Sequence, residues 1–221
     1  MSAHHTALRP RDFTRLYVVG AGGHGREIAW LARQCWDSHL EIIHLVDDPK
    51  YLPPGEHAIG LLSDAQSDGQ TRFVVAIGDA VARRRLAAAC EHRGLRAATL
   101  IHPGVELSAS VEVAEGAVVC AGTVLTTDAH IGRHAHVNIG CTISHDVEIG
   151  EFATLSPGVH VAGHVSIGAE VFIGIGANIV NGRPDRPLSI GDRAVIAAGA
   201  CVTGDVACGA MMAGVPALRK R

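Results

Sequence analysis

The sequence predicts a two-domain protein of class α/β + β, in which a small parallel α/β sheet is followed by a parallel β-helix. Strand-like apolar runs alternate with helical patterns up to about residue 98, and a six-residue period of aliphatic residues takes over from residue 99. The aromatic residues change at a similar place, because both tryptophans, both tyrosines and half of the phenylalanines precede residue 74. We therefore divide the chain into an arm (1–15), an α/β domain (16–98) and a β-helix domain with a C-terminal tail (99–221).

The first part of the chain has the element order of an α/β sheet. Residues 1–15 are polar and contain proline, which is typical of a loose arm. Beyond the arm, short apolar runs that end in glycine or aspartate alternate with segments whose apolar residues recur every three or four positions, as in helices. In chain order we expect a strand at 16–20, a helix at 25–35, strands at 42–46 and 72–77, a helix around 80–93 and a short strand near 96–101.

The second part follows a strict hexapeptide period. Every sixth residue from Ile101 to Ile179 is aliphatic, and the period resumes at Ile190 after five extra residues within 181–187, whose glycine and prolines indicate a loop. In a β-helix, three hexads form one coil and the inward aliphatic residues stack into a ladder. Glycines directly after the ladder residue are expected at corners, where a side chain would be in the way. They are Gly132, Gly150, Gly168 and Gly191.

Composition excludes several classes of protein. With 48% hydrophobic and 19% charged residues the chain is not disordered, and it has no apolar stretch long enough to cross a membrane. No signal-peptide pattern opens the chain, so we expect a cytoplasmic protein without membrane insertion. The net charge of −3 and the scarcity of basic clusters argue against nucleic acid as a partner. The six cysteines lack metal-site spacing and are expected to be reduced and buried.

A series of short motifs carries a resemblance to a known family. The motifs are Gly20-Ala-Gly-Gly-His-Gly25, Asp47-Asp48, Val75-Ala-Ile-Gly78, Ile101-His-Pro103, His145-Asp-Val-Glu-Ile-Gly150, Gly168 with Phe172-Ile-Gly-Ile-Gly176, and Gly214-Val-Pro-Ala217. In this order they resemble the sugar O- or N-acyltransferases related to the sialic acid O-acetyltransferases and the bacillosamine-pathway UDP-4-amino-sugar N-acetyltransferases. The resemblance implies a Rossmann-like N-terminal domain for a nucleotide sugar, a left-handed β-helix, acetyl-CoA as co-substrate, and a homotrimer with active sites between subunits.

The glycine turn of residues 20–25 is the first candidate site. It follows an expected strand and opens a helix, so its N–H groups and the helix dipole can receive a phosphate. Asp47 lies at the next strand end, where it would suit a ribose hydroxyl in a dinucleotide enzyme. The domain is too short for such an enzyme, however, so a UDP- or GDP-sugar fits better than NAD. The alternative is that the glycines only allow close packing of strand and helix. The binding candidates, of which the resemblance assigns His24, Arg26 and Asp47 to the nucleotide sugar, are Gly22, Gly23, His24, Gly25, Arg26, Asp47, Asp48 and Gly78.

His145 is the second candidate site. It lies two residues after the ladder residue Ile143, near a corner, so its ring should leave the core, and imidazole titrates in the range of a general base. The resembling enzymes have their base histidine at this point, and the resemblance places Asn138 in the same site. Asp146 is the natural partner of the imidazole. Because adjacent strand residues point to opposite faces, the pair requires either a corner that turns both side chains outward or a contact across a subunit interface.

These features predict an acetyl-CoA-dependent N-acetyltransferase for a UDP- or GDP-linked 4-amino-deoxy sugar. His145 would take the proton of the attacking amine, and the N–H of Gly163 would stabilise the oxyanion without a covalent acyl-enzyme. No metal is expected. Two departures from the family pattern, the absence of proline after Asp205-Val206 and Thr154 in place of a second histidine, bear on the acceptor and the coenzyme. The coenzyme candidates are Gly163, Gly174, Ala198, Gly199, Val215, Pro216 and Lys220.

Three alternatives remain at this stage. The nearest is O-acetylation of sialic acid or another sugar hydroxyl, which the same base would serve. The others are a zinc enzyme similar to γ-class carbonic anhydrase, another left-handed β-helix trimer, and a non-catalytic β-helix protein. The histidine spacing does not match the zinc pattern, so we expect most of the remaining β-helix histidines at the surface or at interfaces. They are His130, His134, His136, His160 and His164.

Overall fold

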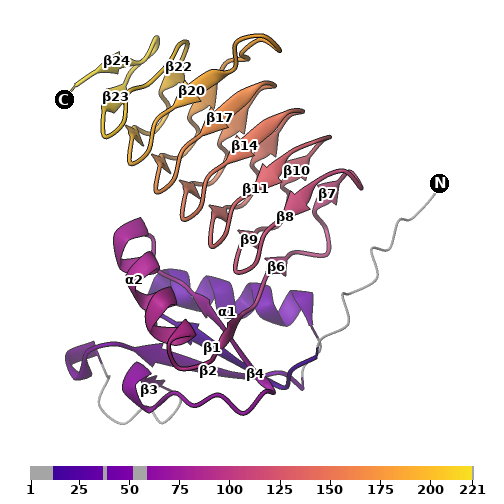
Figure 1. The fold of residues 1–221 in the computed structure, drawn as a ribbon, viewed down its shortest axis with the longest axis vertical. Helices are drawn as coiled ribbons and strands as arrows, with labels where there is room; N and C mark the ends of the chain where they lie inside the picture. Colours follow the sequence, from indigo (N-terminus) through magenta and orange to yellow (C-terminus); the bar gives the residue numbers. More distant parts are fainter. Residues whose placement is uncertain (1–11, 37–38, 52–58, 221) are drawn as a thin grey trace. The chain divides into compact units, whose positions relative to one another are not determined.

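The computed structural model describes residues 12–36, 39–51 and 59–220 (Figure 1). The chain divides into two compact units, 1–103 and 104–221. Most of the expected arm, residues 1–11, lies outside the described residues. Its last residues belong to the first unit instead, because Phe13 is buried against Trp36 and Arg15 begins the first strand. No helix in the described ranges is long and apolar enough to cross a membrane.

The first unit is a five-stranded sheet of order β3-β2-β1-β4-β5, and all of its pairings are parallel. The order puts β1 in the centre, and the chain leaves it first to one side and then to the other. The carboxyl ends of β1 and β4 therefore form the switch point at which such sheets bind ligands. The elements are β1 (Arg15–Val19), α1 (Gly23–Cys35), β2 (Glu41–Val46), η1 (Pro49–Tyr51), β3 (Ile59–Leu61), η2 (Leu62–Asp64), β4 (Thr71–Val75), α2 (Ala80–Glu91), β5 (Arg96–Ala97) and β6 (Leu100–Ile101).

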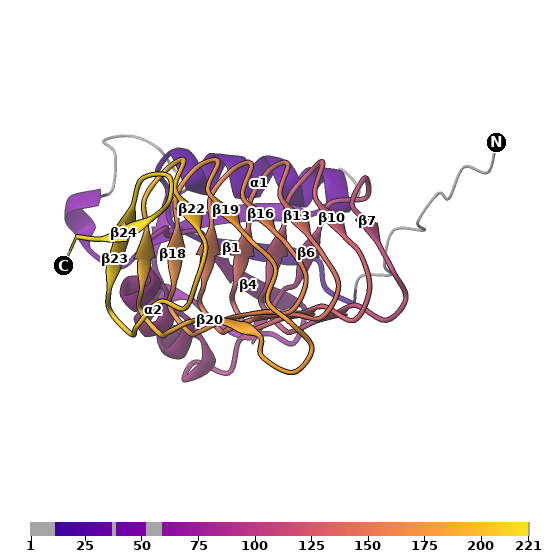
Figure 2. The same ribbon diagram turned by 90° about the horizontal axis from the view of Figure 1, so that it is seen from above.

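The second unit is a parallel β-helix of short strands (Figure 2). Successive strands fall in turn on three sheets. The first sheet contains β9 (Val118–Val119), β12 (His136–Val137), β15 (Thr154–Leu155), β18 (Phe172–Ile173), β21 (Val195–Ile196), β23 (Met211–Ala213) and β24 (Leu218–Arg219). The second contains β7 (Glu106–Leu107), β10 (Val124–Leu125), β13 (Thr142–Ile143), β16 (His160–Val161), β19 (Asn178–Ile179) and β22 (Cys201–Val202). The third contains β8 (Glu112–Val113), β11 (His130–Ile131), β14 (Val147–Ile149), β17 (Val165–Ile167) and β20 (Leu188–Ile190).

Three corners connect these sheets. The first corner joins the first sheet to the second, the second corner joins the second to the third, and the third corner joins the third to the first. Each strand pairs with the strand one coil later, as Ile143 of β13 pairs with Val161 of β16. Residues eighteen positions apart therefore share a corner, apart from the shift caused by the loop at 181–187, which leaves the second corner between β19 and β20.

The aliphatic ladder predicted from the six-residue period forms the core of the β-helix. Every ladder position from Val119 to Ile179 is at most 3% exposed, and so are those that follow the loop. Full burial of one such side chain contributes about 1.5–3 kcal/mol. The first three ladder residues, Ile101, Leu107 and Val113, are half-buried.

The predicted corner glycines stand at the third corner, one above another. A Cβ on Gly150 would lie 2.5 Å from the carbonyl carbon of Gly168, so the backbone of the next coil leaves no room for a side chain. Two positions after its first residue, each of these corners also has a residue with a left-handed backbone φ, which was not predicted from the sequence. At the second corner these residues are Asp128, Asp146 and His164, with φ between 53° and 57°.

Two expectations about side chains in the β-helix are wrong for particular residues. His134 and His136 are 1% exposed rather than at the surface, and His134 stacks on Phe152. Cys208 is exposed and Cys201 half-buried, whereas the other four cysteines are buried. Cys208 lies beyond β20, the last strand of the third sheet, so no later strand of that sheet covers it.

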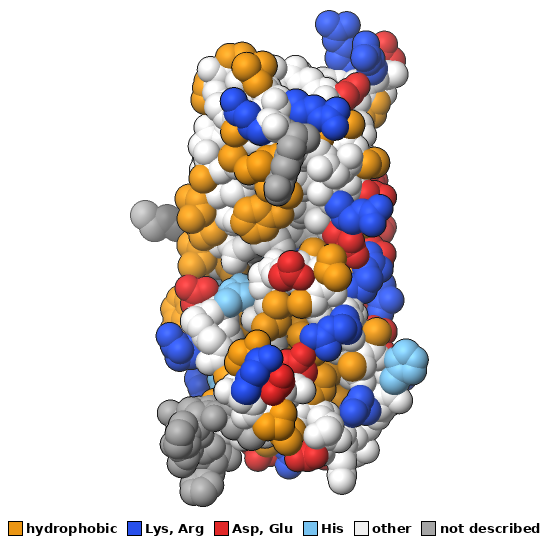
Figure 3. Space-filling model, turned by 90° about the vertical axis from the view of Figure 1, so that its left-hand side faces the viewer, with side chains coloured by type: hydrophobic (Ala, Val, Ile, Leu, Met, Phe, Trp, Pro, Cys, Tyr) orange, Lys and Arg blue, Asp and Glu red, His pale blue; other side chains and the backbone are white. Residues whose placement is uncertain are grey.

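Large apolar side chains are also exposed on the β-helix, and Figure 3 shows hydrophobic side chains gathered on one face of the molecule. The exposed set comprises Ile139, Phe172, Ile175, Val215 and Leu218. Exposed large apolar side chains are candidates for a protein interface.

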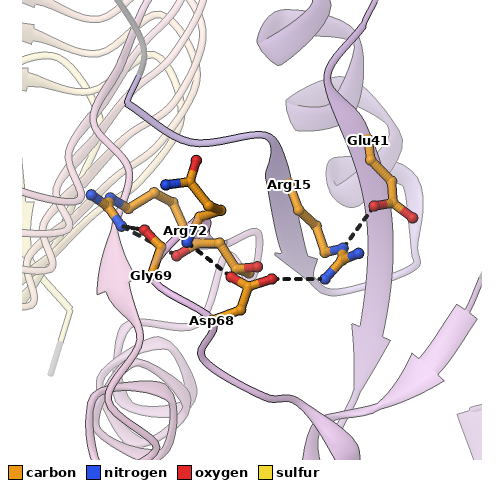
Figure 4. Close-up of polar contacts among 7 residues, drawn as sticks. Arg15, Glu41, Asp68, Gly69 and Arg72 are labelled. Carbon is orange, nitrogen blue, oxygen red and sulfur yellow. Dashed lines mark hydrogen bonds and ion pairs between the residues drawn. The ribbon is translucent and has the colours of Figure 1, made fainter.

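A polar network holds the amino-terminal end of the sheet in the first unit (Figure 4). Arg15 of β1 donates to Glu41 of β2 at 2.7 Å and to Asp68, in the segment before β4, at 3.3 Å. Arg72 of β4 donates to the carbonyl of Gly69 at 3.4 Å. These exposed pairs set the register at this end and contribute little to stability.

Candidate functional site

His145 and Asp146 form a hydrogen-bonded pair at the second corner. His145 Nδ1 donates to Asp146 Oδ2 at 2.7 Å. Asp146 has φ of +56°, so the chain turns between the two residues and both side chains leave the coil. The pair therefore forms within one chain, which is the first of the two arrangements left open above. Because the carboxylate fixes the proton on Nδ1, Nε2 keeps its lone pair and can act as a base.

Gly163 lies directly against the His145 ring, one coil later at the same corner. A Cβ on Gly163 would lie 2.6 Å from Nε2 and closer still to Cε1, so only glycine leaves room for the ring. Among the described residues none accepts a hydrogen bond from the Gly163 N–H. This N–H, next to the basic edge of the ring, can donate to a ligand oxygen.

His164 completes a group of three at this corner. Its Nδ1 lies 3.6 Å from the same Asp146 Oδ2, and its ring packs edge-to-face against His145 with centroids 4.9 Å apart. One ligand atom from each of these three side chains lies within 4.8 Å of the others, and the described residues contain no other such group of metal-ligating side chains. The zinc arrangement considered above is therefore not formed by His130, His134, His136 and His160 within one chain.

Asn138 lies at the first corner, not with His145. Its side-chain amide donates to the Leu155 carbonyl at 2.7 Å, and its backbone carbonyl accepts from the Thr123 hydroxyl at 3.0 Å. In one chain Asn138 thus ties neighbouring coils together. Its predicted place in the His145 site requires a second copy of the chain.

Most coenzyme candidates gather at the first corner, near the C-terminal end of the β-helix. A Cβ on Gly174 would lie 2.5 Å from the Ala198 nitrogen, so the two residues stack on neighbouring coils, and Gly199 follows Ala198. The tail segment with Val215 and Pro216 is held beside them by Cys201. The Cys201 N–H donates to the Gly214 carbonyl, and the Cys201 carbonyl accepts from the Ala217 N–H. Lys220 is exposed just after β24. Gly163 is the exception, since it lies at the second corner.

The first unit contains a cavity of about 960 Å³ at the carboxyl ends of its strands. Four of the predicted binding residues line it, namely Gly22, Arg26, Asp47 and Asp48, and so does Gly20 of the same motif. Gly22 and Gly23 meet nothing within 4 Å, so packing does not explain them, and the first turn of α1 is open to a ligand. Nitrogen atoms at a helix start favour phosphate groups.

Packing does explain two other glycines of this motif. Gly20 has φ of +128°, and a Cβ there would lie 2.7 Å from the Ala76 carbonyl. Gly25 is buried against the Gly20 carbonyl. Close strand–helix packing and an open helix start thus coexist in one motif. Gly23, His24, Gly25 and Gly78 do not line the cavity, and His24 instead lies 3.4 Å from Glu27.

Two pairs of charged side chains lie in the cavity. Arg85 of α2 donates to Asp47 at 2.7 Å, and Lys50 lies 2.8 Å from Asp48 and over the Tyr51 ring. The hydrogen bond from Lys50 lowers the pKa of the Asp48 carboxyl. Lys50, Tyr51 and Arg85 were not among the residues predicted from the sequence. A basic residue and an aromatic residue shortly after Asp47-Asp48, beyond Pro49, were a usable signal for the first two.

A buried arginine supports the turn that follows β4. Arg83 of α2 donates to the Ile77 carbonyl at 2.7 Å and to that of Gly78 at 3.4 Å, and burial lowers its pKa to about 10. Gly78 thus has a structural contact with α2 in addition to its predicted role.

Comparison with known proteins decides the family. Residues 15–90 match the PglD N-terminal domain. Perosamine N-acetyltransferase from Caulobacter crescentus, crystallised with CoA and GDP-perosamine, is 30% identical over 93% of this chain and 96% of its own, with a TM-score of 0.83. The chain belongs to the hexapeptide-repeat sugar N-acetyltransferases.

Two other solved structures agree with this assignment. The acetyltransferase domain of PglB from Neisseria gonorrhoeae FA1090, in complex with acetyl coenzyme A, is 31% identical over 94% of this chain and 99% of its own, with a TM-score of 0.84. WeeI from Acinetobacter baumannii AYE is 29% identical over 93% and 100%, with a TM-score of 0.85. No curated protein sequence matches the chain. The predicted family and fold class of this acetyltransferase are therefore confirmed.

Proposed function

We propose that this acetyltransferase moves the acetyl group of acetyl-CoA to the amine of a nucleotide-linked 4-amino-deoxy sugar. The observation that carries the proposal is the His145–Asp146 pair, with Gly163 against the Nε2 edge of the ring, at the second corner. The relative from Caulobacter crescentus, bound to CoA and GDP-perosamine, supports an amino-sugar acceptor and a CoA donor.

In the proposed reaction the sugar nitrogen attacks the thioester carbonyl, and His145 Nε2 takes a proton from that nitrogen. Asp146 stabilises the imidazolium, and the Gly163 N–H donates to the oxyanion of the tetrahedral intermediate. The C–S bond then breaks, and the imidazolium returns the proton to the sulfur of CoA. The buried Cys141 is unsuited to carry the acetyl group, because burial raises the pKa of its thiol and the thiol donates to the Ser156 carbonyl at 3.3 Å.

The cavity of the first unit is the proposed site for the nucleotide. Its phosphates would lie at Gly22, directly before the first turn of α1, near the Arg26 guanidinium. Asp47 would accept from a ribose hydroxyl, and the exposed Tyr51 ring offers a stacking surface for a base. The charges present suit either a UDP- or a GDP-sugar.

A homotrimer is the proposed assembly. His145 and Gly163 lie at the second corner, whereas Asn138 and the other coenzyme candidates lie at the first, so a site that uses both groups needs two copies of the chain. The exposed apolar side chains Ile139, Phe172 and Ile175 lie on or beside that first corner and suit such an interface. We place the reaction in the cytoplasm, where CoA thioesters and sugar nucleotides are available.

The test is release of CoA thiol with a panel of UDP- and GDP-4-amino-deoxy sugars, together with sialic acid as a hydroxyl acceptor. We expect turnover with at least one nucleotide amino sugar, its loss in His145→Ala, and a trimeric mass in light scattering. Turnover with sialic acid alone would favour the O-acetyltransferase. No release with any acceptor would refute the proposal, and a monomeric mass would refute the shared site.

A further inference from the structure

The base of this site is held by few contacts. The His145 side chain is 53% exposed and that of Asp146 is 49% exposed. A half-exposed imidazole on a corner can swing between rotamers unless neighbouring groups restrict it. The Asp146 carboxylate, which is equally exposed, cannot restrict the imidazole by itself unless it is held in turn.

His164 is the neighbour that holds both side chains. Its Nδ1 lies 3.6 Å from Asp146 Oδ2, the oxygen that accepts from His145, and its ring lies edge-to-face against the His145 ring at 4.9 Å. The His164 side chain is only 22% exposed. It is thus the most buried member of the group and contacts each of the other two.

The backbone of His164 is fixed from two sides. Its N–H donates to the His145 carbonyl at 3.2 Å, and its carbonyl accepts from Leu188 at 3.0 Å. A Cβ on Gly182 would collide with that carbonyl, so the loop at 181–187 also packs against it. His164 therefore projects from a part of the second corner that is more firmly held than the two side chains it contacts.

We infer that His164 is a positioning residue for the base: it holds the Asp146 carboxylate and the edge of the His145 ring so that Nε2 stays aimed at the acceptor amine. The inference rests on the proposed acetyl transfer. His164 acts through Asp146 and does not touch the reacting atoms. Removing it should lower kcat while leaving binding of both substrates unchanged.

Three single variants separate this role from a general structural one. His164→Ala removes the contact, whereas His164→Asn keeps an N–H near the position of Nδ1 and tolerates the left-handed φ of 57°. His160→Ala is the matched control, an exposed histidine of the same coil bonded to Thr142. We expect His164→Ala to lower kcat about tenfold with both KM values within about twofold, His164→Asn to restore most of kcat, and the control to match the wild type. An unchanged kcat in His164→Ala, an altered KM for acetyl-CoA, or no rescue by asparagine would overturn the inference.

A double-mutant cycle tests the route through Asp146. Because His164 acts in part through that carboxylate, adding His164→Ala to Asp146→Ala should lower kcat less than His164→Ala does in the wild type. Independent, multiplying losses would overturn the inference.

A structural readout keeps the two proposals distinguishable if the wild type acetylates none of the acceptors. In crystal structures of the wild-type protein and His164→Ala, we expect the His145 Nδ1 to Asp146 Oδ2 contact to lengthen or the ring to adopt a second rotamer in the variant. An unchanged pair would overturn the positioning role, whereas a failed acceptor panel bears only on the proposed function.

Discussion

Replacing Gly163 by alanine tests whether the position of the His145 ring sets the rate of acetyl transfer. Alanine keeps the backbone N–H that we propose as the oxyanion donor, and the φ of Gly163 is not left-handed, so the substitution introduces little beyond one methyl group. That methyl would lie 2.6 Å from Nε2, whereas ordinary van der Waals contact begins at 3.4 Å. Because the ring is half-exposed, it can move away toward solvent and leave the coil intact.

The size of the effect follows from this displacement. The ring must retreat by about 1 Å to restore normal contact distances. A misplacement of about 1 Å costs about 100-fold in rate, which corresponds to about 2.7 kcal/mol in activation free energy. The free energy of unfolding should change little, since the moving ring lies outside the core.

The assay is steady-state CoA release at saturating acetyl-CoA and nucleotide amino sugar, with thermal unfolding measured in parallel. Gly204→Ala is the matched control. Gly204 occupies the same place at the second corner in a later coil, its φ is also not left-handed, and a Cβ there meets nothing within 4 Å. The control should keep the wild-type kcat and melting temperature. A Gly163→Ala variant with kcat within about threefold of the wild type would refute the argument from ring position, and so would an equal loss in the control.

The remaining predictions concern stability, substrate binding and metal. Arg83→Met should lower the free energy of unfolding by about 1 kcal/mol in urea titrations, because it leaves the half-buried Ile77 carbonyl without its donor; an unchanged midpoint would contradict this. Arg85→Ala should raise KM for the nucleotide sugar about fivefold at constant kcat, since Asp47 loses its partner in the cavity; a change in kcat alone would contradict a role of Arg85 in binding this substrate. Burial raises the pKa of the Cys35 and Cys90 thiols to about 12 from the ordinary value of 9.0, so the stability they contribute is complete below pH 9 and is lost as the pH rises from 9 to 12. The loss in urea titrations should reach about 1.4 kcal/mol per pH unit for each thiol, and a flat profile from pH 8 to 10 would count against their burial. Dialysis against a strong chelator should leave kcat unchanged in the proposed metal-free mechanism, and activity restored only by added zinc would revive a metal role.

The core of the β-helix could be predicted from the sequence because its rule is local. A side chain at a ladder position points inward whatever lies elsewhere in the chain, so the six-residue period identifies the buried residues from Val119 to Ile179 directly. The burial of His134 could not be found in this way. It depends on a stacking partner, Phe152, one coil away, and on a left-handed corner that a non-glycine residue adopts.

The cavity of the first unit shows a similar limit. Asp47 and Asp48 were predicted because strand ends in a parallel sheet meet at one edge. Arg85 was missed because it comes from a helix whose rotation against the sheet is set by packing. Its neighbour Arg83, in the same run of three arginines, is buried instead and supports the turn at Gly78. The run of arginines alone does not distinguish the residue that faces the ligand from the one that faces the core.

The division of the proposed acetyl-transfer site between two corners could have been inferred from the six-residue period combined with the family motif. Residues eighteen positions apart share a corner, so His145 belongs with Gly163, and Asn138 belongs with Gly174 two coils later. The seven positions between Asn138 and His145 place these residues at successive corners instead. A family motif that assigns both to one active site therefore already implies that one chain contributes only part of it. Combined with the period, the motif carries information about assembly that neither contains separately.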